Sequence, residues 1–114
     1  MQLFTSTIRA VLLANGTRSR SDIHHDPVPV VKLFTPDAGA TWLLTELDPE
    51  NPDIAFGICD LGLGSPELGS VSIREIESLR GALGLPVERD LHFHSDRPLS
   101  LLADAARSVG AIRI

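Results

Sequence analysis

The alternation of apolar and polar residues predicts a run of β-strands through the middle of the chain. We expect these strands at residues 28–34, 41–47, 54–60, 68–72 and 91–94. In the third strand, Ile54, Phe56 and Ile58 fall on one face, as in a half-buried strand. Short turn-forming segments separate the strands, which favours antiparallel neighbours.

A helical pattern precedes the β region. Ile8 and Leu12 fall on one apolar stripe, which predicts a helix over residues 5–15 that stops at Gly16. The polar segment 17–27 ends in proline and is expected to be a mobile loop.

Two more helices are predicted in the second half of the chain. Ser72 and Glu75 have the spacing of a capping box and begin a helix over residues 73–80, with Gly81 near its end. A last helix is expected over residues 98–108.

These elements predict one α+β domain over residues 1–114. We expect a four- or five-stranded, mostly antiparallel sheet packed on one face by two or three helices. Residues 1–27 form the N-terminal helix and loop, and residues 28–114 form the sheet-and-helix core. The other face is expected to be partly open. Trp42 and Glu46, two positions of equal parity on one strand, are expected on it or near its rim.

Charge and aromatic content bear on the partner class. The 114-residue chain carries a net charge of -5, has only 10 Lys and Arg, and has four Phe, one Trp and no Tyr. Nucleic-acid binding is disfavoured, because it depends on clustered cations and stacking aromatics. A basic patch assembled in three dimensions is the remaining route, from Arg9, Arg18, Arg20 and Arg107.

The single cysteine, Cys59, excludes an internal disulfide and a Cys-x-x-Cys zinc motif. A reducing, cytoplasmic location is expected. The first residues lack the pattern of a signal peptide, and no apolar run approaches the ~20 residues that cross a bilayer. We therefore expect no membrane association.

Several short motifs occur in the order and spacing of a known family. They are residues 31–37 (VKLFTPD), 41–42 (TW), 48–50 (DPE), 56–57 (FG), 66–69 (PELG), 77–81 (ESLRG) and 84–93 (GLPVERDLHF). On these motifs the chain, from Val30 to about Ser100, resembles the family catalogued as domain of unknown function 2958.

The resemblance implies a small protein of bacteria, plasmids or phages, often carried on a mobile genetic element. It implies no activity, cofactor or catalytic residue. Relatives commonly carry an aromatic residue where this chain has Leu43 and where it has Val71.

Carboxylates surround the only tryptophan. They are Asp37, Glu46, Asp48 and Glu50. Asp37 follows a proline and Asp48 precedes one, so turn chemistry accounts for both. The alternative is that Glu46 beside Trp42 is a recognition acceptor or a base.

Arg89 is the expected partner of these carboxylates. Its guanidinium group can donate two parallel hydrogen bonds to one carboxylate, which favours an ion pair with Glu46 or Glu67, or contact with an anionic ligand. The candidates for ligand or partner binding are Trp42, Glu46, Arg89, Asp90 and Asp37.

His92 and His94 form a His-x-His pair on the expected fifth strand, and His24 and His25 lie in the loop. This pair is a possible metal ligand set, but sequence spacing supplies no third ligand. We therefore expect no metal and no other cofactor.

The function these observations favour is a non-enzymatic accessory or protein-interaction protein of a mobile genetic element. A partner protein is expected at the open sheet face or at turns 35–40 and 48–53. A homodimer through a sheet edge near Pro29 or residues 91–93 stays open.

Two alternatives remain. One is a small carboxylate-based or metal-assisted hydrolase that uses Glu46, Asp48 and Asp90, which requires these groups to converge. The other is a weak nucleic-acid-binding module.

Overall fold

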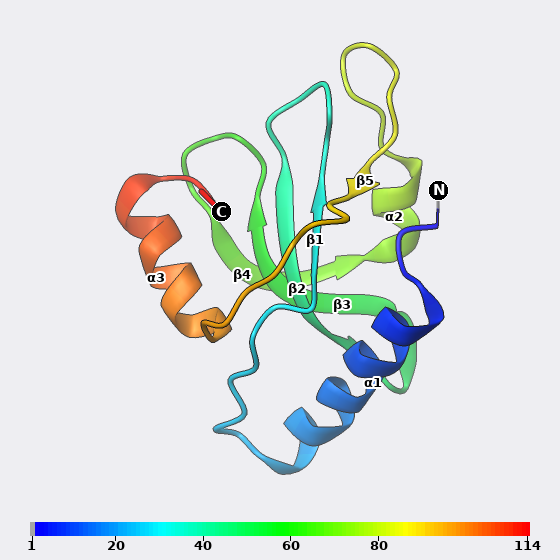
Figure 1. The fold of residues 1–114 in the computed structure, drawn as a ribbon, viewed down its shortest axis with the longest axis vertical. Helices are drawn as coiled ribbons and strands as arrows, with labels where there is room; N and C mark the ends of the chain where they lie inside the picture. The colour runs from blue at the N-terminus through cyan, green and yellow to red at the C-terminus, as the bar shows by residue number, and fades with distance from the viewer. Residues whose placement is uncertain (1) are drawn as a thin grey trace.

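A five-stranded antiparallel sheet forms the centre of the computed structural model, which describes residues 2–114 (Figure 1). The strands are β1 (Val31–Phe34), β2 (Thr41–Asp48), β3 (Asn51–Asp60), β4 (Glu67–Ser72) and β5 (Glu88–Arg89). They lie in the order β4-β3-β2-β1-β5, so β4 and β5 are the edges. The predicted α+β class is confirmed.

Helices pack on both faces of this sheet. They are α1 (Ser6–Ser21), α2 (Ile73–Ser78) and α3 (Leu99–Val109). Leu12 of α1 and Ile76 of α2 belong to one apolar cluster with Leu44 of β2. The adjacent β2 residue, Leu43, packs instead with Leu102 of α3 in a second cluster. The face that was predicted to be open is therefore covered in part by α3 (Figure 1).

Helix α1 continues past its predicted end. Thr5 caps its start, because the Thr5 hydroxyl accepts the backbone amide of Ile8 at 3.1 Å. Gly16 is buried inside the helix, where a Cβ atom would lie 1.9 Å from the carbonyl oxygen of Leu47. This glycine allows α1 to approach β2 closely and does not end the helix. Residues 17–21, predicted as loop, are helical.

The fifth strand lies earlier than predicted. It is Glu88–Arg89, and it pairs with β1 through Arg89 opposite Leu33. Residues 91–94 are not a strand. The side chain of Asp90 accepts the backbone amide of His92 at 2.9 Å, which turns the chain away after β5.

The other helix ends are held by side chains. Ser72 accepts the amide of Glu75 at 3.2 Å, which confirms one half of the capping box at the start of α2. At α3, the carboxylate of Asp26 accepts the amide of Ser100 at 3.1 Å. The segment before β1 is thereby attached to α3. Within residues 2–114, no helix is long and apolar enough to cross a membrane.

Candidate functional site

Trp42 is a core residue. It is 2% exposed and packs in the cluster between the sheet and α1 and α2. Its neighbours across the sheet are Leu33 on β1 and Cys59 on β3. The prediction of a surface tryptophan is therefore wrong.

A β-bulge separates Glu46 from Trp42. Leu44 pairs with Gly57 and Glu46 pairs with Phe56, so Thr45 is the extra residue on β2. Its hydroxyl donates to the carbonyl of Phe56 at 3.3 Å. Because the bulge interrupts the alternation of faces, the equal parity of Glu46 and Trp42 does not place them on one face, and that prediction is wrong. Glu46 instead accepts a hydrogen bond from Ser19 of α1 at 2.9 Å.

Two further carboxylates at this end of β2, those of Asp48 and Glu50, form ion pairs with α1. Arg20 approaches Asp48 at 3.3 Å and Glu50 at 2.9 Å. The hydrogen bond from Arg20, with its charge, holds the pKa of Glu50 below its usual range. The acidic group thus fixes the end of α1 on the β2–β3 hairpin.

Arg89 contacts backbone and not a carboxylate. Its guanidinium donates to the carbonyl oxygens of Gln2 and Leu3, each at 2.8 Å. Glu67 lies on β4, at the opposite edge of the sheet. The predicted pairing of Arg89 with Glu46 or Glu67 is therefore wrong, and Arg89 instead holds the segment before α1.

Asp90 lies beside β1, away from the β2 carboxylates. Its side chain is 3.7 Å from the ammonium group of Lys32. It lines two surface hollows, and neither is lined by Glu46 or Asp48. The three carboxylates required by the hydrolase alternative do not share a cleft.

No group of three His, Cys, Asp or Glu side chains within residues 2–114 is arranged to hold a metal ion. His92 and His94 are exposed in the loop after β5. Burial raises the pKa of the Cys59 thiol to about 11, which disfavours the reactive thiolate.

The cations proposed as a basic patch are mostly paired. Arg18 pairs with Asp22 at 3.8 Å, and Arg107 pairs with Asp104 at 3.3 Å. Arg20 bonds to the hairpin carboxylates described above. Arg107 also lies on α3, across the sheet from α1, so these arginines do not form one surface.

Asp37 joins two loops. Its carboxylate accepts the backbone amides of Leu83 at 2.6 Å and Leu85 at 3.3 Å. A Cβ atom on Gly81 would lie 1.7 Å from an oxygen of the same carboxylate, so a larger residue there would displace the Asp37 side chain from its hydrogen bonds. Asp37 therefore fixes the loop that precedes β5 against the β1–β2 turn.

Three loops meet at this end of the sheet, and we call residues 35–40, 61–66 and 81–86 the loop end (Figure 1). Gly62 approaches the backbone of Gly39, so the β3–β4 loop contacts the β1–β2 turn on its other side. Leu63 is 81% exposed and Leu83 is 80% exposed. Leu61 and Leu85 are exposed beside them. Large exposed apolar side chains on ordered loops are candidates for partner contact.

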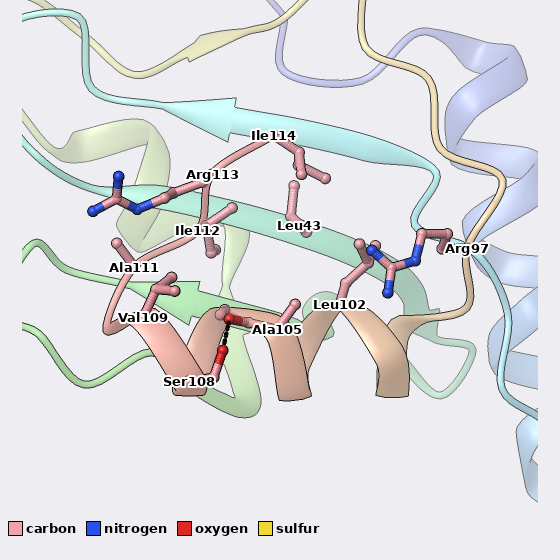
Figure 2. A pocket seen from close by; sticks show the side chains of 11 residues that line it. Leu43, Arg97, Leu102, Ala105, Ser108, Val109, Ala111, Ile112, Arg113 and Ile114 are labelled. Atoms are coloured by element: carbon pink, nitrogen blue, oxygen red, sulfur yellow. Dashed lines mark hydrogen bonds between the residues drawn. The ribbon is translucent and has the colours of Figure 1, made fainter.

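A cavity of about 290 Å³ lies between α3, β2 and the segment that follows α3 (Figure 2). We call it the α3 groove. Leu43 and Leu102 give it an apolar floor, Ile112 lies in one wall, and Arg97 and Arg113 lie at its two ends. Ser108 on the wall donates to the carbonyl of Ala105.

Of these two surfaces, only turn 35–40 of the loop end was expected from sequence, and the α3 groove was not. The loop leucines occur singly between glycines and prolines, and no local pattern shows that their loops meet. Asp60 was also missed. It is 5% exposed, and its carboxylate accepts the amides of Gly62 at 2.8 Å and Ile112 at 2.9 Å.

Comparison with known proteins gives one family and no individual relative. Neither a curated protein nor a solved structure gives a significant match. The family model described as protein of unknown function (DUF2958) matches residues 3–113, which is nearly the whole chain and includes α1. The chain therefore belongs to the DUF2958 family of proteins of unknown function.

Proposed function

We propose that this chain is a non-enzymatic accessory protein of a mobile genetic element and that its loop end binds a partner protein. The observation that carries the proposal is the exposure of Leu63 and Leu83 on loops that are fixed by hydrogen bonds. Ordered loops lose little conformational entropy on binding, so apolar contacts there convert efficiently into affinity.

The partner we expect is a protein with a shallow apolar patch. Leu63 and Leu83 project from separate loops, with the β1–β2 turn between them. This turn, residues 35–40, is one of the two that the sequence analysis nominated for partner contact. The association with a mobile element rests on the family resemblance described above.

The polar groups that an enzyme would need support a non-enzymatic role. Glu46, Asp48 and Arg89 each bond to another part of the fold. Their contacts join α1, or the segment before it, to the sheet. These contacts account for the polar residues that first indicated a catalytic site.

Affinity purification from the host, followed by reconstitution with the purified partner, tests the proposal. The wild-type chain is compared with the double variant Leu63→Ser/Leu83→Ser and with Leu101→Ser. Leu101 is exposed on α3, outside the loop end, and provides a matched control. Stability of all three should agree within about 0.5 kcal/mol, because the replaced side chains are exposed.

The expected result is one partner that binds the wild type and Leu101→Ser and is lost with the double variant. Failure to enrich any partner, or binding that the double variant retains, would overturn the proposal. Sedimentation of the purified chain tests a second copy as the partner. A dimer that the double variant turns into a monomer would assign the loop end to self-association and also overturn it.

A further inference from the structure

The α3 groove is a second site, independent of the partner protein proposed above. It lies on the face of the sheet that α3 covers, whereas the loop end lies where the strands turn. Its volume of about 290 Å³ is near the lower limit for small-molecule pockets. This size fits a short chain molecule and excludes a dinucleotide or a bound helix.

The groove can take an apolar chain along its length. Leu43 and Leu102 are buried at its floor, and Ala105 and Val109 of α3 form one wall. The opposite wall is the segment after α3, which carries Ile112 (Figure 2). An apolar ligand here would displace water from these surfaces, which is favourable.

One end of the groove carries the exposed guanidinium of Arg97. Arg97 extends toward Leu102 (Figure 2), and within residues 2–114 no carboxylate lies at ion-pair distance from its guanidinium. In contrast, Arg107 on the outer side of α3 is paired with Asp104. Arg113 lies at the other end and its guanidinium points away from Leu43 (Figure 2), so the head group is placed at Arg97.

We propose that the α3 groove binds a small carboxylate that carries a linear apolar tail. The guanidinium of Arg97 would donate one hydrogen bond to each of the two carboxylate oxygens, and the tail would lie over Leu43 toward Ile112. The cation of Arg97 matches the carboxylate of such a molecule, and the apolar floor matches its tail. A peptide with acidic and apolar residues offers the same groups but needs a longer surface than this cavity.

Octanoate is the probe, and its neutral analogue octanol is the ligand control. Titration followed by the amide signals of the ¹⁵N-labelled protein gives both the affinity and the site. We expect octanoate to bind about tenfold more tightly than octanol, because a charge-assisted hydrogen bond is gained. The shifted signals should come from α3, Leu43 and residues 111–114.

Three variants sharpen the test. Arg97→Gln should weaken octanoate binding about tenfold and leave octanol binding unchanged. Ala105→Phe should abolish binding of both, because the ring would fill the groove. Arg107→Gln should bind like the wild type, since Arg107 pairs with Asp104, does not line the groove and lies on the same helix as Ala105.

Equal binding of octanoate and octanol would overturn the proposal, as would equal losses in Arg97→Gln and Arg107→Gln. Signal changes confined to other surfaces would overturn it too, as would binding of an acidic, apolar peptide by a protein that ignores octanoate. The double variant Leu63→Ser/Leu83→Ser should bind octanoate normally, which separates this site from the loop end. Loss of octanoate binding in that variant would contradict the separation.

Discussion

Asp37 and Leu83 are joined across 46 positions of sequence by one hydrogen bond, in which the Asp37 carboxylate accepts the Leu83 amide at 2.6 Å. The same oxygen also accepts the amide of Leu85. A side chain in the β1–β2 turn thereby sets the position of the loop that carries two of the exposed leucines. We infer that Asp37 is a positioning residue for the loop end.

Asp37→Asn should loosen this loop and destabilise the fold by about 1–3 kcal/mol, since a neutral amide oxygen accepts the two backbone amides more weakly than a carboxylate oxygen. Urea unfolding measures the stability loss. Trypsin should also cleave faster after Arg80, which directly precedes residues 81–86.

The matched control for that variant is Asp104→Asn. Asp104 pairs only with exposed Arg107 on the same helix, so its removal should change stability by less than about 0.5 kcal/mol. Cleavage after Arg80 should stay at the wild-type rate. Equal effects of the two variants would show that Asp37 has no special role in the loop.

Gly16→Ala should be destabilising, by about 1–3 kcal/mol, because the added methyl group would overlap the carbonyl oxygen of Leu47. Alanine is otherwise the better helix residue by about 1 kcal/mol. A loss of stability would therefore indicate the close contact with Leu47, and a gain would indicate that helix propensity dominates. Gly69→Ala on β4 is the control, since a Cβ atom there meets nothing within 4 Å. A Gly16→Ala protein with a higher midpoint of thermal unfolding would contradict the close contact.

Cys59 should resist alkylation in the folded protein. Burial raises the pKa of its thiol to about 11, so at about pH 8 the thiolate is scarce. Iodoacetamide should modify it slowly under native conditions and rapidly in guanidinium chloride. Because the folded pKa is raised, the associated stability is present at neutral pH and is lost as the pH rises toward 11. Rapid modification of the native protein at about pH 8 would contradict this account.

Asp53 should stabilise the start of α2 in a pH-dependent way. The hydrogen bond from the Ser72 hydroxyl at 2.6 Å, and then that from the Arg74 amide at 2.9 Å, lowers the pKa of Asp53 below 3.8. The stability this provides is therefore present above that value and is lost as the pH falls through the lower folded pKa.

The comparison is with Asp53→Asn across about pH 2 to 6, by urea unfolding at each pH. The variant should be less stable at the upper end, and the two curves should converge in acid. Glu75→Gln is a useful control, because the Glu75 side chain makes no hydrogen bond to the Asp53–Ser72 pair. A constant difference between wild type and Asp53→Asn would show that ionisation of Asp53 is not the cause.

Most of the sheet could be predicted because alternation along a strand directly reflects which residues are buried. The strand predicted at 41–47 is β2, which extends only one residue further. The third strand begins earlier than predicted, at Asn51, because Asp48 pairs with Asn51 in a tight hairpin. Pro52 falls within the predicted turn 48–53, yet β3 includes it.

The errors lie where a distant contact overrides a local signal. Gly16 resembles a helix stop in sequence, but glycine is required at this position because the carbonyl group of Leu47 leaves no room for a side chain. The strand at 41–47 was assumed to alternate throughout, and the bulge at Thr45 breaks the alternation. The prediction that Trp42 and Glu46 share one face of the strand was wrong for that reason.

The roles of the polar residues were equally hidden. Arg89 was expected to meet a carboxylate, but it bonds to carbonyl oxygens at Gln2 and Leu3, 86 or more positions away. Sequence shows that such a residue has donors and does not show which backbone lies within reach. The choice of Asp37 as a binding candidate remains a prediction, now attached to a defined surface.

Asp60 has a consequence for how the molecule moves. Its two oxygens hold Gly62 in the β3–β4 loop and Ile112 in the wall of the α3 groove. Neither segment can detach without leaving a buried carboxylate oxygen unsatisfied, which is costly. Replacing Asp60 by alanine should therefore speed hydrogen exchange at the amides of both Gly62 and Ile112, on two segments that this one side chain joins.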